Sequence, residues 1–164
     1  MDSTQKQFAA VNKLVDFVAQ EAVKEVGRIV FDKIRVGWRQ PQTGSFGSPV
    51  LTGRFYTSHR VALGSKDSSV TPENVGSESS PLPKLTFQYY DRSVQGFKIG
   101  TDIIISNSLD YAVDLEEGFS RKTPSGVYRV SVEAAKVQII SGGLPRTKKA
   151  AEGRATSVAK RLAA

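Results

Sequence analysis

The sequence has 164 residues, 39% of them apolar and 24% charged, and a formal net charge of +7. This length suits one domain with its own core and is short for two. No stretch approaches the roughly 18 apolar residues of a membrane span, and the first residues lack a signal-peptide profile. Cysteine is absent, which excludes disulfides and thiolate metal sites. We therefore expect a protein that folds in a cytoplasm, without membrane contact.

The positive charge is concentrated near the C-terminus. Residues 40–143 carry ten basic and ten acidic side chains, whereas residues 144–164 carry six basic side chains and one acidic side chain. Such a segment can meet phosphates, contact an acidic protein face or stay solvated. Because no aromatic residues alternate with these charges, the last two interpretations are favoured over nucleic-acid binding.

Residues 4–38 are predicted to form one long amphipathic helix, because apolar residues recur every three to five positions. Ser3 is its expected N-cap. A helix of this length spans roughly 50 Å, more than a small sheet requires. Two interpretations stay open: part of the apolar stripe packs on a neighbouring subunit, or the helix bends at Gly27 and packs wholly on its own core.

The middle of the chain is predicted to contain short strands separated by loops. Glycine and proline mark residues 40–53 as a loop, and a strand is expected at 55–63. Residues 64–83 are rich in Ser, Pro and Gly, so a mobile insertion or extended arm is expected there. Residues 85–90 and 97–106 form the best hairpin candidate. Within it, Ile103, Ile104 and Ile105 suggest a strand covered on both faces.

Two more helices are predicted in the last third of the sequence. A short one covers 109–117 and ends at Gly118, and a second covers about 130–141 and ends at two glycines. The Ala/Lys/Arg segment from Pro145 onward is expected to be helical only when docked. The predicted class is α+β, with a long N-terminal helix and a shorter helix on a small antiparallel sheet. Residues 1–143 form the domain, and 144–164 form a basic C-terminal extension.

Catalytic and metal-binding patterns are weak. His59 is the only histidine, and without a second nitrogen or sulfur ligand or a Gly-x-Ser-x-Gly elbow it predicts neither a zinc site nor a triad. Asp110 and Asp114 stand one helical turn apart, near Glu116 and Glu117, and could share a magnesium ion or act as a carboxylate pair. A solvated or interface-facing acidic edge is the more common meaning of such a cluster. Phosphate-loop and dinucleotide fingerprints are absent, so no cofactor and no enzymatic activity are predicted.

Two segments resemble elements of the tailed-bacteriophage neck and tail-completion proteins, a family of head–tail joining and minor tail proteins. Residues 52–64, TGRFYTSHRVALG, resemble its first element, which follows the first long helix. Residues 105–126 resemble its second element, which runs from Ser/Asn-Asn through Tyr-Ala and Glu-x-Gly to Pro-x-Gly before the last helix. The matching fold or interface residues are Gly53, Arg54, Asn107, Tyr111, Glu116 and Gly118, with Pro124 and Gly126 closing the second element. The family often has proline where this chain has Asp110.

The resemblance implies a structural virion protein of the neck or upper tail, assembled in the host cytoplasm. It implies a homo-oligomeric ring, typically hexameric, that takes part in viral assembly as a head–tail connector or tail-completion protein. The expected partners are copies of itself and neighbouring head-completion, tail-terminator or tail-tube proteins. DNA would pass through the lumen without specific binding. The alternatives are a tail-terminator ring, a basic DNA-binding module and a hydrolase built on the acidic cluster.

The residue types also suggest roles for individual side chains within the two matching segments. Tyr111 can bury its ring against the sheet while its hydroxyl finds a partner. Glu116 precedes a turn that ends in glycine and can accept hydrogen bonds from the backbone or from a neighbouring subunit's arginine. Arg54 is the candidate for that arginine. The other interpretation is that this segment only closes the fold.

Overall fold

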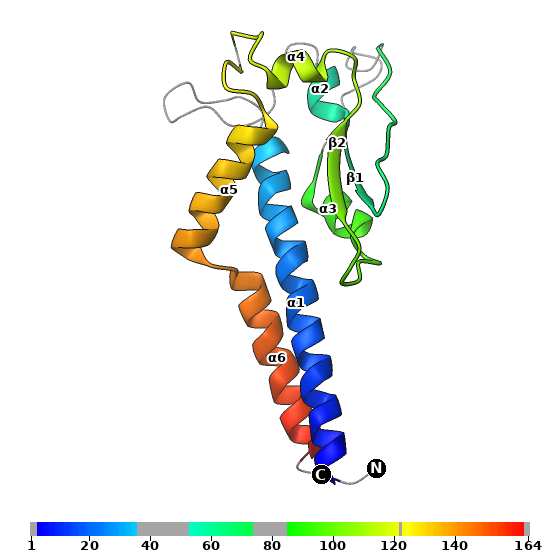
Figure 1. The fold of residues 1–164 in the computed structure, drawn as a ribbon, viewed down its shortest axis with the longest axis vertical. Coiled ribbons are helices and arrows are strands. Elements are labelled where there is room, and N and C mark those ends of the chain that lie inside the picture. The colour runs from blue at the N-terminus through cyan, green and yellow to red at the C-terminus, as the bar shows by residue number, and fades with distance from the viewer. Residues whose placement is uncertain (1–2, 36–52, 74–84, 122, 163–164) are drawn as a thin grey trace.

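The computed structural model describes residues 3–35, 53–73, 85–121 and 123–162. The fold is α+β, as the sequence predicts: the long helix α1 (Ser3–Arg35) runs along most of the molecule, and a two-stranded antiparallel sheet lies beside one end of it. We call that end the head, and we call the N-terminal half of α1 together with α6 (Pro145–Leu162) the stalk (Figure 1). The first turn of α1 and the last turn of α6 lie together at the free end of the stalk. Among the described residues, no helix is both long and apolar enough to cross a bilayer.

Helix α1 spans Ser3–Arg35 and agrees with the predicted long helix, while positions 36–38 of that prediction lie outside the described residues. Its C-terminal half carries the core residues Phe31 and Ile34, which are fully buried. Tyr90 lies so close to α1 that a Cβ on Gly27 would collide with its hydroxyl group. That hydroxyl donates a hydrogen bond to the Lys24 carbonyl (2.9 Å). The absence of a side chain at Gly27 therefore lets the helix that carries Tyr90 pack closely against α1.

The segment predicted as a strand at 55–63 divides into two elements. Helix α2 (Arg54–Thr57) is a single turn that follows Gly53, and strand β1 (His59–Leu63) begins only after it. Gly53 has φ +79°, a conformation that other residues rarely adopt. The Thr57 amide donates to the Gly53 carbonyl (2.9 Å), which closes the turn. Aromatic and β-branched residues in 55–58 mimic a strand, but this turn prevents one from starting there.

Strand β1 pairs with β2 (Ile103–Asn107), with His59 opposite Asn107 and Leu63 opposite Ile103. The sheet contacts α1 and α3. All three consecutive isoleucines of β2 are half-buried, so the expectation of a strand covered on both faces was wrong. A sheet of two strands is too narrow to be covered fully by the two helices beside it.

The predicted hairpin of 85–90 with 97–106 was also wrong. Residues 87–90 belong to helix α3 (Phe87–Ser93), and β2 takes β1 as its partner. Thr86 is the N-cap of α3, because its hydroxyl accepts a hydrogen bond from the Tyr89 amide (3.1 Å). Tyr90 and Val94, four residues apart, point into the core with Phe31 and Val61. The cap and this helical spacing outweigh the β propensity of the aromatic residues.

Three helices complete the chain. Helix α4 (Ala112–Glu116) precedes Gly118, and α5 (Tyr128–Gly142) precedes Gly143, close to both predicted helices. Helix α6 (Pro145–Leu162) contains most of the predicted basic extension and packs along α1 of the same chain. The residues expected to be helical only when docked therefore form a helix that is docked on α1 (Figure 1).

Part of the predicted arm at 64–83 folds back onto the head. The Thr71 amide donates to the Ser58 hydroxyl (3.0 Å), and the buried Thr71 hydroxyl donates to the Thr57 carbonyl (2.9 Å). Residues 64–73 thus have hydrogen-bonded anchors, and residues 74–83 lie outside the described residues.

Candidate functional site

The two sequence elements that carry the resemblance lie against each other in the head. Their strands β1 and β2 are paired, and Asn107 ties them together at the end of the sheet. Its side-chain amide donates to the Phe55 carbonyl (2.9 Å), and its oxygen accepts from the Leu109 amide (3.2 Å). Phe55, Leu109 and Val127 then form one buried apolar cluster. The two elements are therefore one structural unit, which we call the motif junction.

Glu116 lies at the centre of the motif junction and caps helix α5. Its carboxylate accepts hydrogen bonds from the backbone amides of Val127 (2.7 Å), Tyr128 (2.7 Å) and Arg129 (2.9 Å). The first amides of a helix have no partner within the helix and carry its positive dipole end, so a carboxylate stabilises them. Glu116 thus accepts from the backbone of its own chain.

Two glycines give the motif junction its close packing. Gly118 and Gly126 have φ +88° and +82°. A Cβ on Gly118 would collide with the Pro124 carbonyl. The Glu-x-Gly and Pro-x-Gly parts of the second element are therefore mutually dependent, since each glycine makes room for the other part of the loop.

Arg54 is engaged within its own chain. Its Nε donates to the Thr71 carbonyl (3.0 Å), and its guanidinium pairs with Glu73 (3.0 Å). Both contacts join α2 to the anchored segment 64–73. The sequence led us to expect that Arg54 contacts Glu116 of a neighbouring subunit. In the structure, both side chains already have partners within their own chain.

Tyr111 and His59 pack around Phe55 at the motif junction. The half-buried ring of Tyr111 lies 6.3 Å from that of Phe55, and burial raises the pKa of Tyr111. His59 is fully buried, and its Nδ1 shares a hydrogen bond of 2.8 Å with the Tyr128 hydroxyl. Burial, together with the charge of Arg60, lowers the pKa of His59 to about 3. The ring is therefore neutral near pH 7 and is fully buried.

The acidic cluster divides between the inside and the outside of α4. Glu116 faces α5, whereas Asp110, Asp114 and Glu117 are exposed. In the described parts of the chain, no group of three or more potential ligand side chains is arranged to hold a metal ion. The carboxylates on the outer face are thus available to a solvent or protein partner.

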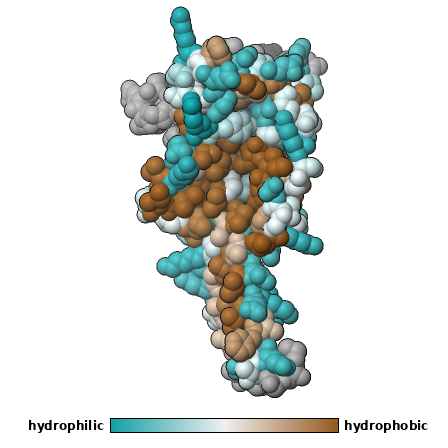
Figure 2. Space-filling view, in the orientation of Figure 1, coloured by the Kyte–Doolittle hydropathy of each residue, from teal (hydrophilic) through white to brown (hydrophobic). Residues whose placement is uncertain are grey.

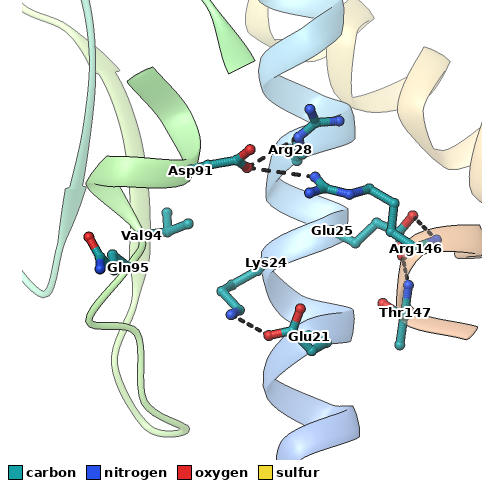
Figure 3. Close-up of a pocket in the computed structure, with 9 residues that line it drawn as sticks. All are labelled: Glu21, Lys24, Glu25, Arg28, Asp91, Val94, Gln95, Arg146 and Thr147. Carbon is teal, nitrogen blue, oxygen red and sulfur yellow. Dashed lines mark hydrogen bonds and ion pairs between the residues drawn. The ribbon is translucent and has the colours of Figure 1, made fainter. Parts of the chain in front are cut away.

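A charged cavity of about 280 Å³ lies where α1, α3 and the start of α6 meet (Figure 3). Asp91 of α3 pairs with Arg28 (3.2 Å) and Arg146 (3.6 Å). The buried carboxylate of Glu25 accepts from the amides of Arg146 (2.9 Å) and Thr147 (2.7 Å), which caps α6. Because these charged groups pair with one another, they join α1 to α3 and to the start of α6, and so connect the stalk with the head.

The most conspicuous unpartnered surface is apolar and lies on the helices. Phe8 and Val15 of α1 are 66% and 60% exposed. With Val11, Val23 and Val26 they recur every three to eight residues and lie on one side of α1, which we call the apolar strip. On α5, Val137 and Ile140 are also exposed. Figure 2 shows apolar groups gathered over α5 and the middle of the molecule and continuing down the stalk.

A second surface of the stalk was missed by the sequence reasoning. A groove of about 380 Å³ between α1 and α6 is lined by Lys6, Lys13, Arg154 and Arg161. We call it the basic groove. The signal was present, because each helix places two cations seven residues apart on one face. Recognising the groove also requires knowing that α6 packs along α1, and the sequence alone did not indicate this.

No protein-family model, curated protein or solved structure matches this chain. We therefore infer a function from the motif junction, the apolar strip, the basic groove and the exposed carboxylates beside α4.

Proposed function

We propose that this protein is a structural component of a tailed-phage virion, which forms a homo-oligomeric ring at the head–tail junction or in the upper tail. The proposal assigns it no catalytic role. The tail-terminator position is the alternative station within the same particle.

The resemblance supports the proposal through two elements that fold as one unit. Residues from both elements meet around Phe55, and Glu116 of the second element caps the helix that follows. Each element alone is a short and common pattern. Because the two elements together build one junction that follows a long first helix, a chance resemblance of both is less expected.

The apolar strip is the observation that carries the proposal. Helix α6 covers one side of the N-terminal half of α1 and leaves Phe8, Val11 and Val15 on another side uncovered. Monomeric proteins expose single apolar side chains but rarely extend them along a helix, because each buried methylene contributes about 0.8 kcal/mol. A strip of this kind is typical of a surface that becomes covered during assembly.

A closed ring requires that one patch of each subunit meets a different patch of the next. The molecule offers distinct apolar surfaces on α1 and α5 for that purpose. Adjoining head-completion, tail-terminator or tail-tube rings would contact the remaining faces, and DNA would pass through the lumen without specific recognition.

The test combines the mass of the protein in solution with its position in the particle. We expect a defined oligomer by sedimentation velocity, and labelling of the virion neck or upper tail by immuno-electron microscopy. Val11→Asp with Val15→Asp should dissociate the oligomer, whereas Lys149→Asp with Lys160→Asp, on exposed positions of α6, should not. A protein absent from purified virions would refute the proposal.

A further inference from the structure

Two charged surfaces that have no ion pairs among the described residues lie at opposite ends of the molecule and have opposite signs. The basic groove is at the stalk, near the chain termini, and α4 is at the far end of the head (Figure 1). They are therefore separated by the long axis of one molecule. Any contact between them has to join two copies.

The basic groove combines four cations with an apolar floor. Leu14 of α1 and Val158 of α6 are half-buried between the charged side chains. Within the described part of the chain, no ion pair reaches Lys6, Lys13, Arg154 or Arg161. Arg154 instead lies over the ring of Phe17, at 5.4 Å. Four like charges along one seam repel each other, so an anionic occupant would lower the free energy of the stalk.

The outer side of α4 has the complementary composition. Val113 and Asp114 lie on the short helix α4, and Asp110 and Glu117 lie in the turns directly before and after it. All four are exposed, Val113 to 63%, and Phe119 beside them is 78% exposed. Tyr111 and Leu115 point the other way, into the cluster of the motif junction. We call this outer side the acidic knob.

We propose that the acidic knob of one copy docks in the basic groove of the next copy. This inference rests on the proposed self-assembly and adds a charged contact to the apolar surfaces of α1 and α5. The three carboxylates of the knob face the cations of the groove, while Val113 and Phe119 cover Leu14 and Val158. Complementary charge fixes the orientation of such a contact, and its apolar centre supplies affinity.

The groove's composition favours a protein segment over nucleic acid. A phosphate backbone would neutralise the cations but would leave the aliphatic floor without a partner. Bases stack on aromatic side chains, and no aromatic residue lines this groove in the described chain. The knob supplies both an anionic and an apolar part, in the same 10-residue segment 110–119.

The knob–groove contact is heterologous, because each copy uses a different surface toward each neighbour. Such a contact closes into a ring when its rotation returns to the first copy, and otherwise continues as a filament. It also predicts that one copy with a damaged groove and one with a damaged knob can still form a single contact.

The experiment uses two charge-reversal variants of the full chain. The groove variant is Arg154→Glu with Arg161→Glu, and the knob variant is Asp114→Lys with Glu117→Lys. The matched control, Lys149→Glu with Lys160→Glu, changes the net charge as the groove variant does but on exposed positions that do not line the groove. Circular dichroism establishes that each variant is folded.

Sedimentation velocity gives the outcome. We expect each reversal to weaken self-association at least about tenfold relative to wild type and control, and high salt to weaken the wild-type contact. An equimolar mixture of the two variants should self-associate more tightly than either variant alone, because the intact knob of one meets the intact groove of the other. Folded variants that stay monomeric in the mixture, or that assemble as the wild type does, would overturn the contact.

Two further outcomes separate this contact from the proposed function. A wild-type ring that neither reversal affects removes the knob–groove contact and leaves the ring in place, whereas a wild-type protein that is monomeric and absent from virions overturns both. Binding of duplex DNA that the groove variant loses, with self-association unchanged, would make the groove a nucleic-acid site and would also overturn the contact.

Discussion

The carboxylate of Glu116 lies in the space that a side chain on Gly126 would need. A Cβ on Gly126 would lie 2.9 Å from Oε1 of Glu116 and 2.5 Å from its backbone carbonyl. Because Gly126 has no side chain to fill this space, the carboxylate of Glu116 reaches the first backbone amides of α5. The absence of a side chain at Gly126 therefore lets Glu116 hold both the loop and the start of helix α5 in place.

Replacing Gly126 by alanine should destabilise the protein. The φ of +82° disfavours any side chain, and the new methyl would overlap Glu116, so we expect a loss of about 1–3 kcal/mol in the free energy of unfolding. Urea denaturation followed by circular dichroism measures it. Gly153→Ala is the control: its Cβ would meet nothing within 4 Å, and in a helix it should stabilise by about 0.5–1 kcal/mol. Equal effects of the two changes would contradict this account.

Replacing Glu116 by alanine removes the shared acceptor of three amides. We expect the free energy of unfolding to fall by about 1–3 kcal/mol, because the N-terminus of α5 loses its cap and its favourable charge. The matched control is Glu117→Ala at the neighbouring exposed position, which should change stability by less than about 0.5 kcal/mol in dilute, monomeric protein. Similar losses in both variants would mean that the cap does not stabilise the fold.

The sequence predicted well those elements whose signals are local. The long helix follows from apolar residues at helical spacing, and Gly118 and the pair at 142–143 end their helices as expected. The hairpin was wrong because strand pairing is decided by distant partners: β2 pairs with β1, and Thr86 starts a helix where aromatic residues suggested a strand. Propensity alone does not contain that choice.

For the site, the sequence identified residues but not their directions. Glu116, Gly118 and Asn107 were singled out, and the structure places them in contacts within one chain. Whether Glu116 would accept from backbone or from a neighbour's arginine depended on where α5 begins in space. The basic groove was missed for the same reason, since Lys13 and Arg154 come together only through the docking of α6 on α1.

The buried histidine should make the stability fall as the pH is lowered. His59 has a pKa of about 3 in the folded protein and about 6.5 when unfolded, so between these values the unfolded state binds more protons. Stability should therefore decrease as the pH falls through about 6.5, by up to about 1.4 kcal/mol per pH unit. Urea denaturation of the wild type and of His59→Gln, which lacks this proton, gives the difference in slope.

Nuclear magnetic resonance gives a direct check of the same group. His59 is the only histidine in the sequence, so its ring signals need no separate assignment. We expect no titration of these signals between about pH 5 and 8, whereas a solvated imidazole would titrate near 6.5. A midpoint in that range would contradict the burial of the ring and its pairing with Tyr128.

Glu25 should hold α6 on the stalk through its charge. Burial alone would raise the pKa of its carboxyl, but hydrogen bonds from Thr147 and Arg146 outweigh burial and hold that pKa below its ordinary value. The ionised form therefore stabilises the folded state. This contribution is present above the unfolded pKa of about 4.3 and is lost as the pH falls below it. Glu25→Gln removes it at every pH.

Hydrogen exchange resolves where the loss of Glu25 acts. At neutral pH, Glu25→Gln should speed exchange within α6 by at least about tenfold, and much less within α5, whose cap is Glu116. Glu21→Gln is the control, because Glu21 pairs with Lys24 of the same helix. Acid unfolding provides the second measurement: the stability difference between wild type and Glu25→Gln should shrink as the pH falls through about 4. Uniform acceleration across α5 and α6 would indicate that the two helices open together, and the local role of Glu25 would then be wrong.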